Sequence, residues 1–281
     1  IMKRKILTLS LLSGFSFFGM AQPTLVWEKS FGGSSTDGAN SIKHTSDGGS
    51  IVAGQSASGT DDVTNPHGQI DYWVTKLSSA GALEWQKTYG GSGEDYATSI
   101  IPTSDGGYIM TGYSNSLDGD VTNLNGNTDI WVVKITSNGT ISWQKTLGGT
   151  GVEYSGNIIE TSGGGFMVAG RSNSADGDVT GGHGLMDAWL VKLTSTGTID
   201  WQKTYGGTGE EGATFIKETS DGGYFFSGYT NSSDGDVTSN QGGYDYWGVK
   251  VTSTGTLSWQ KNLGGTGEDI AYIMDETSTG E

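Results

Sequence analysis

The chain has 281 residues and a formal net charge of −16, and it contains 49 glycines, 3 prolines and no cysteine. The acidic excess argues against nucleic acid and anionic lipid as partners, and the chain itself can form no disulfide and carries no thiol chemistry. A charged fraction of 16% with 10% aromatic residues is typical of a folded chain, and the many glycines favour strands and tight turns over helices.

Residues 1–21 have the pattern of a secretory signal peptide. The basic start Lys3-Arg4-Lys5 precedes an apolar run from Ile6 to Phe18, and small residues end at Ala21. The run is shorter than the roughly 20 residues of a membrane-spanning helix, so we favour cleavage after Ala21 over a membrane anchor. Cleavage lowers the basic count from 15 to 12 against 31 acidic residues, which changes the net charge from −16 to −19. The sequence predicts a secreted or cell-surface protein that passes through the periplasm, with no membrane span after cleavage.

The nine tryptophans fall into two series, and within each series every step is 58 residues. The two series are Trp73, Trp131, Trp189, Trp247 and Trp27, Trp85, Trp143, Trp201, Trp259. A period of this size is typical of repeat architectures whose units bury their apolar faces only against neighbouring units. Both series lie at a fixed register within expected strands, so we interpret them as packing residues between repeats rather than as sugar-stacking platforms.

Each repeat follows one plan, which is clearest at residues 95–147. A first strand over 95–103 meets a second over 108–113 at the turn Ser104-Asp-Gly-Gly107, where the Asp-Gly pair predicts a two-residue hairpin turn because both central positions tolerate positive φ. A long loop over 114–128 leads to a third strand over 129–136 that is apolar on both faces and should be buried. A fourth, more polar strand over 141–147 should lie outermost, with Lys145 protecting its edge.

This plan predicts an all-β chain, namely a β-propeller of four-stranded antiparallel blades within a single domain over residues 22–281. The blades are expected at 37–89, 95–147, 153–205 and 211–263. A stacked solenoid is disfavoured, because parallel β-helices use shorter coils without two such hairpins per repeat. Residues 24–31 and 268–277 are expected to be single strands of an incomplete fifth blade, so we expect a truncated product of a protein with at least five blades.

Two motifs carry a family resemblance. The segments Ser-Asp-Gly-Gly-Tyr-Ile-Met-Thr-Gly at 104–112 and Asp-Ile-Trp-Val-Val-Lys-Ile-Thr-Ser-Asn-Gly-Thr-Ile at 129–141 resemble the delta-sixty-like repeats of secreted Bacteroidetes β-propellers exported by type IX secretion. The resemblance covers residues 27–281. The turn Thr-Gly-Thr-Ile-Asp-Trp at 196–201 is similar, at the level of the fold, to the tryptophan-docking turn of quinoprotein propellers. The resemblance implies an exported or cell-surface propeller, usually followed by a C-terminal sorting domain that has no counterpart in this sequence.

The long loops hold repeated aspartates that suggest a calcium site. Asp-Gly-Asp motifs recur at one position of three repeats, and a further aspartate follows the second member of each by nine residues. The aspartates concerned are Asp118, Asp120, Asp129, Asp176, Asp178, Asp187, Asp234, Asp236 and Asp245. Carboxylates that alternate with backbone carbonyls suit calcium, but full EF-hand spacing is absent, so we favour aspartate turns with the loop backbone. Another set of acidic pairs, Glu94-Asp95, Glu210-Glu211 and Glu268-Asp269, either rings the channel mouth or is solvated, and we favour solvated acids.

Catalysis has little support in the sequence. The three histidines are His44, His67 and His183, and no nucleophile, base and orienting acid depart together from the repeat pattern. The sequence predicts an exported, non-catalytic scaffold for binding or surface display, with an unidentified protein or glycan as ligand. The alternatives are an extracellular carbohydrate-binding protein, or part of a polysaccharide hydrolase or lyase whose active site lies outside this sequence.

Overall fold

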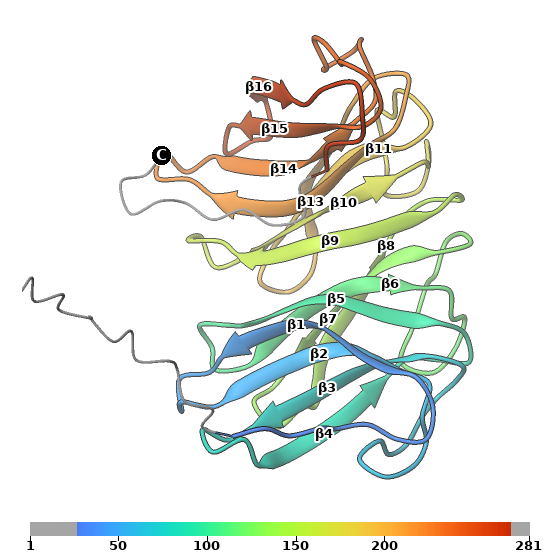
Figure 1. The fold of residues 1–281 in the computed structure, drawn as a ribbon, viewed down its shortest axis with the longest axis vertical. Helices are drawn as coiled ribbons and strands as arrows, with labels where there is room; N and C mark the ends of the chain where they lie inside the picture. The colour runs from blue at the N-terminus through green and yellow to red at the C-terminus, as the bar shows by residue number, and fades with distance from the viewer. Residues whose placement is uncertain (1–26, 271–281) are drawn as a thin grey trace, which may run out of the picture.

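The structure is a computed structural model that describes residues 27–270. The predicted signal peptide over residues 1–21, and residues 24–26 and 271–277 of the two predicted terminal strands, lie outside the described residues. Sixteen strands form four sheets of four, and each sheet is antiparallel with its strands in chain order. The predicted fold class is confirmed, because the described chain is all-β and its four sheets repeat one plan in a propeller-like arrangement (Figure 1).

The strands recur at corresponding positions of the four repeats. The first sheet contains β1 Asp37–His44, β2 Ser50–Ser56, β3 Asp71–Leu77 and β4 Leu83–Tyr89; the second contains β5 Asp95–Pro102, β6 Tyr108–Ser114, β7 Asp129–Ile135 and β8 Ile141–Leu147. The third contains β9 Glu153–Glu160, β10 Phe166–Ser172, β11 Asp187–Leu193 and β12 Ile199–Tyr205; the fourth contains β13 Glu211–Glu218, β14 Tyr224–Thr230, β15 Asp245–Val251 and β16 Leu257–Leu263. No helix between residues 27 and 270 is long and apolar enough to span a membrane.

The first hairpin of each sheet closes with a different turn from the one predicted. In the second sheet, Gly106 N donates to Thr103 O and Thr103 N donates to Gly107 O, both at 2.9 Å. Gly106 has φ of 83°, while Asp105 is not among the residues with positive φ. The loop is therefore a type I turn followed by a left-handed glycine, and only one of the two central positions needs positive φ. The carboxylate of Asp105 holds the turn by accepting from Thr103 Oγ1 and Gly107 N.

The innermost strands surround a common axis. The first strands of consecutive sheets pack side by side, β1 with β5, β5 with β9 and β9 with β13. A cavity of about 370 Å³ is lined from all four of these strands, by residues that include Asn40, Thr98, Asn157 and Thr214. One cavity reached by four successive repeats indicates sheets arranged around an axis, as in a propeller, and not a straight stack.

Consecutive sheets pack face to face and bury one another's aromatic side chains. The third-strand tryptophans Trp131, Trp189 and Trp247 are fully buried, and Trp73 is 8% exposed. In the outer strands, Trp85 of the first sheet packs against Tyr108 of the second, with ring centroids 6.3 Å apart, and Trp143 meets Phe166 of the third sheet in the same way at 6.0 Å. Burial of these aromatic faces provides a large part of the folding free energy in a chain without disulfides.

The described residues do not close the ring. Ile100, Ile158 and Ile216 occupy one position of the second, third and fourth sheets and are 0% exposed, whereas the matching Ile42 of the first sheet is 61% exposed. The first sheet therefore lacks the neighbour that covers this position in the others. Figure 1 shows the first and fourth sheets at opposite ends of the described chain.

Residues 27–31, the described part of the predicted strand 24–31, are not assigned as a strand. Trp27 nevertheless packs where an outer-strand tryptophan of a preceding sheet would pack. A Cβ atom at Gly81, in the turn before β4, would lie 2.6 Å from Trp27 Cδ2, and one at Gly197 would lie 2.8 Å from Trp143 Cε3. Residues 268–270 also have no strand assignment.

Candidate functional site

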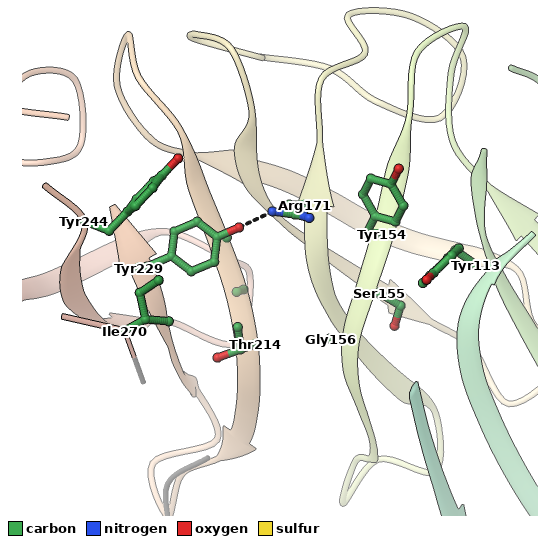
Figure 2. Close-up of a pocket in the computed structure, with 11 residues that line it drawn as sticks. Tyr113, Tyr154, Ser155, Gly156, Arg171, Thr214, Tyr229, Tyr244 and Ile270 are labelled. Atoms are coloured by element: carbon green, nitrogen blue, oxygen red, sulfur yellow. Dashed lines mark hydrogen bonds between the residues drawn. The ribbon is translucent and has the colours of Figure 1, made fainter. Parts of the chain in front are cut away.

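A pocket of about 520 Å³ opens at the end of the axis where the long loops emerge. It lies between the second, third and fourth sheets and shares Gly156 and Thr214 with the axial cavity. Figure 2 shows the lining, which consists of Tyr113, Tyr154, Ser155, Gly156, Arg171, Gly212, Ala213, Thr214, Tyr229, Tyr244 and Ile270. Four tyrosines and one arginine dominate it, and none of the lining residues between positions 27 and 270 is an aspartate or glutamate.

Strand register places these residues together. The second residue of each innermost strand pairs with the penultimate residue of the second strand in the same sheet. The four pairs are Gly38 with Gln55, Tyr96 with Tyr113, Tyr154 with Arg171, and Gly212 with Tyr229. The repeats differ at this pair, as they do at other positions of the innermost strands. We call the end of the axis that these pairs surround the axial mouth.

The aromatic side chains form a continuous arc around the mouth. Tyr96 stacks on Tyr113 with centroids 5.1 Å apart, and Tyr113 meets Tyr154 edge-on at 4.9 Å. The Arg171 guanidinium carbon lies 5.0 Å from the Tyr154 ring centroid, a cation–π contact. These contacts fix the tyrosine faces and the arginine in one orientation.

The arc continues through hydrogen bonds into the fourth sheet. Arg171 Nη1 donates to the Tyr229 hydroxyl, a bond that Figure 2 shows as a dashed line, and Tyr229 meets Tyr244 edge-on at 5.2 Å. The Tyr244 hydroxyl in turn donates to Glu210. Gly212 permits this arrangement, because a Cβ atom there would lie 2.7 Å from the Tyr229 ring.

The surroundings of the pocket phenols raise their pKa values. The hydrogen bond to Glu210 raises the pKa of Tyr244 to about 12, because an ionised phenol could not donate it. Burial raises the pKa of Tyr113, and Tyr96, Tyr154 and Glu94 raise it further. Both phenols are neutral at pH 7, as an unshifted tyrosine also is, and Tyr244 donates its proton to Glu210. The arrangement offers flat faces, hydroxyl groups and one cation to a ligand.

The Asp-Gly-Asp motifs lie away from this pocket lining and bind backbone. Asp176 accepts from Thr150 N at 2.7 Å and from Thr150 Oγ1 at 2.9 Å, and Asp234 accepts from Thr208 in the same way at 2.8 and 2.9 Å. Asp118 accepts from Ser92 N at 2.6 Å. Each motif thus ties the linker that enters a sheet to the long loop of that sheet.

The second aspartates of the motifs also contact groups of neighbouring segments. Asp120 and Asp236 accept from Gly90 N and Gly206 N at 3.3 and 3.2 Å, and Asp178 Oδ2 lies 3.7 Å from Lys145 Nζ. Asp129, Asp187 and Asp245 each accept from a backbone N–H four residues earlier. Between residues 27 and 270 no three or more histidine, cysteine, aspartate or glutamate side chains are grouped as a metal site would require.

The preference for solvated acids at the sheet entry was wrong for the second member of the pairs Glu94-Asp95 and Glu210-Glu211, whereas Glu268 and Asp269 are both exposed, as expected. Asp95 and Glu211 are 0% exposed, as is Glu153 at the same position of the third sheet. Glu153 accepts from Gly149 N at 3.0 Å and from the hydroxyls of Ser172 and Ser174, both at 2.6 Å. These bonds satisfy the carboxylate without water, which explains how it tolerates burial.

Each of these acids faces another buried carboxyl group from the preceding sheet. A Cβ atom at Gly148 would touch both Glu153 Oε2 and Asp129 Oδ1, and Gly90 and Gly206 stand in the same relation to Asp71 with Asp95 and to Asp187 with Glu211. Burial, and then Glu153 and Asp178, raise the pKa of Asp129 to about 6, against a hydrogen bond from Asn125 N that lowers it. Burial also raises the pKa of Asp71, Asp95 and Asp187.

Sequence reasoning missed Arg171 and the tyrosines of the mouth. The signal was present, because aligning the repeats at their 58-residue period gives Gln55, Tyr113, Arg171 and Tyr229 at one position. Arg171 is also the one arginine of the chain after Arg4. The period alone did not show that these positions lie together at the axis.

Comparison with known proteins gives a similarity in fold only. No protein-family model matches the chain, and no curated protein matches it. Among solved structures it is similar to a crystal structure of a protein of unknown function from Bacteroides caccae, with 14% sequence identity and a TM-score of 0.46. That similarity covers 83% of this chain and 69% of the other.

Proposed function

We propose that this chain is an exported, non-catalytic binding module whose ligand site is the tyrosine–arginine pocket at the axial mouth. The observation that carries the proposal is the lining itself, in which three sheets together present four tyrosine side chains and one arginine at a single pocket. The repeats carry different residues at these positions, as a site that surrounds one ligand requires.

A carbohydrate is the ligand class that fits this lining best. Sugar rings present C–H faces that stack on aromatic rings, and their hydroxyls pair with phenol, serine and threonine groups such as those of Tyr113, Ser155 and Thr214. The volume of about 520 Å³ lies within the roughly 300 to 1,000 Å³ range of ligand pockets. The described lining holds no carboxylate and so gives no support to glycoside cleavage, which ordinarily uses two carboxyl groups.

Glycan-array screening of the full chain, followed by calorimetry on the hits, tests the proposal. Tyr154→Ala should weaken binding at least tenfold, because Tyr154 supplies a ring face and orients Arg171. Gln55→Ala is the matched control, since Gln55 occupies the position of Arg171 in the first sheet and does not line the pocket. Equal weakening by both variants, or no glycan ligand at all, would contradict the proposal; chromatography of the bound glycan should show no cleavage product.

The proposal of export rests on the pattern of residues 1–21. Expression of the full chain in a Gram-negative host tests it by mass spectrometry of the protein outside the inner membrane. A mature N-terminus at Gln22 is the expected result. Retention of Lys3 to Lys5 on protein found in the cytoplasm would count against it.

A further inference from the structure

We infer that the pocket selects an acidic sugar, a uronic acid residue whose carboxylate pairs with Arg171. The inference deepens the proposed function and rests on it. Its starting point is that Arg171 is the one charged side chain among the described lining residues, in a chain with a formal net charge of −16.

Arg171 is held in place and keeps donors available. One of its nitrogens, Nη1, donates to Tyr229, and its guanidinium lies over Tyr154. A guanidinium has five N–H donors in a planar fork that matches the two oxygens of a carboxylate. Between residues 27 and 270 no carboxylate forms an ion pair with it, although ion pairs form at Lys76, Lys134 and Lys250. We therefore expect a ligand to supply the anion that forms an ion pair with Arg171.

Two glutamates act on tyrosines of the lining and limit the ligand charge. Glu210 accepts a hydrogen bond from the Tyr244 hydroxyl, and the charge of Glu94 contributes to the raised pKa of Tyr113. Both would repel a second negative charge on the ligand. A single carboxylate matches the single guanidinium, whereas a phosphate dianion would leave one charge unpaired beside these glutamates.

The aromatic arc restricts the chemical group of the ligand to which the carboxylate is attached. Tyr154 and Tyr229 flank Arg171 on either side, and Tyr113 and Tyr244 extend the lining outward from them (Figure 2). A carboxylate on Arg171 would place the group attached to it between these rings. A pyranose ring suits that space, because it stacks through its C–H face and presents hydroxyls at its edge.

Calorimetry with a glucuronic acid oligosaccharide and its carboxyl-reduced, neutral counterpart tests the inference. The full chain should bind the acidic form at least tenfold more tightly, and added salt should weaken that preference. Arg171→Gln should weaken binding of the acidic form at least tenfold more than binding of the neutral form, so that the preference is lost, and Arg171→Lys should retain part of it. Gln55→Ala should change neither affinity, and circular dichroism should show that each variant is folded.

The outcomes separate this inference from the proposed function. Equal binding of the two sugars, unchanged in Arg171→Gln, would overturn the acidic preference and leave a neutral-glycan site standing. Stronger binding of a sulfated sugar than of the uronic acid would also overturn it, since the site would then read anions other than carboxylate. Absence of binding to either sugar and to the glycan array would contradict both.

Discussion

The phenol of Tyr72 in the first sheet donates a hydrogen bond of 2.9 Å to the backbone carbonyl of Trp131 in the second sheet, and the two ring centroids lie 4.7 Å apart. Both side chains are fully buried. Burial raises the pKa of Tyr72 well above its usual value, so the phenol stays protonated and remains a donor at neutral pH. This contact joins one sheet to the next through packing and a directional bond.

Removing the hydroxyl should weaken the junction without removing its packing. Tyr72→Phe is expected to lower the free energy of unfolding by about 1 to 2 kcal/mol, because the buried Trp131 carbonyl loses a donor. Tyr96→Phe, at a half-exposed ring of the mouth, should change it by less than about 0.5 kcal/mol. Urea denaturation of both variants checks this, and an equal loss in the two would contradict a junction-specific role.

The outer-strand tryptophans provide a matched comparison of sheets with and without a following neighbour. Trp143 packs against Phe166 of the next sheet, whereas Trp259 in the last described sheet is 50% exposed. Trp143→Ala should cost about 2 to 4 kcal/mol, and Trp259→Ala less than half as much. Similar losses in thermal and urea unfolding would mean that the outer strands do not seal neighbouring sheets.

Buried carboxyl pairs should make the protein more stable in mild acid. The folded-state pKa of Asp129 is about 6, above the roughly 3.9 of an unfolded aspartate, so the folded state binds more protons between these values. The stabilisation is fully present below pH 4 and is lost as pH rises through 6. The direction is the same for Asp71, Asp95 and Asp187. Protonation of other carboxylates in stronger acid limits the pH range of this stabilisation to about pH 5 and above.

Replacing one member of a pair isolates this effect. Asp129→Asn keeps an oxygen for Asn125 N and removes the charge that faces Glu153, so the free energy of unfolding at pH 8 should rise by about 2 kcal/mol. Its slope against pH between 5 and 7 should become flatter. Asp200→Asn, at a side chain that is 54% exposed, is the control. Unfolding curves at pH 5, 6, 7 and 8 check this prediction. A loss of stability at pH 8 would show instead that the ionised carboxylate of Asp129 stabilises the folded protein.

Calcium should have little effect on stability. The carboxylates of Asp118, Asp176 and Asp234 already accept N–H groups of the linkers, and Thr150 and Thr208 add hydroxyl bonds to the last two. The melting temperature should be the same with 5 to 10 mM calcium and with chelator, whereas Asp176→Ala should lower it in both. A rise with calcium that Asp176→Ala abolishes would establish the metal interpretation instead.

Local patterns in the sequence were sufficient to predict the architecture. Alternating strands, Gly-rich turns and the 58-residue period each act within one repeat, and together they predicted four antiparallel sheets. The exact turn was missed because an Asp-Gly pair also suits a type I turn, in which Asp105 binds the backbone and Gly106 alone is left-handed.

These local patterns were not sufficient to predict the candidate site. Tyr113, Arg171 and Tyr229 come from three different sheets and meet only because register and the axis bring one position of each repeat together. The burial of Asp95 and Glu211 was missed for a related reason: an acidic residue at a strand entry is ordinarily solvated, and the donors that replace water here come from linkers and second strands.

A crystal structure of the full chain with a glucuronic acid oligosaccharide tests the central claim most directly. The account predicts a sugar ring between Tyr154 and Tyr229 with its carboxylate on the Arg171 guanidinium. Density for the sugar on an outer strand, or a pocket left unfilled at a ligand concentration that saturates binding in solution, would contradict it.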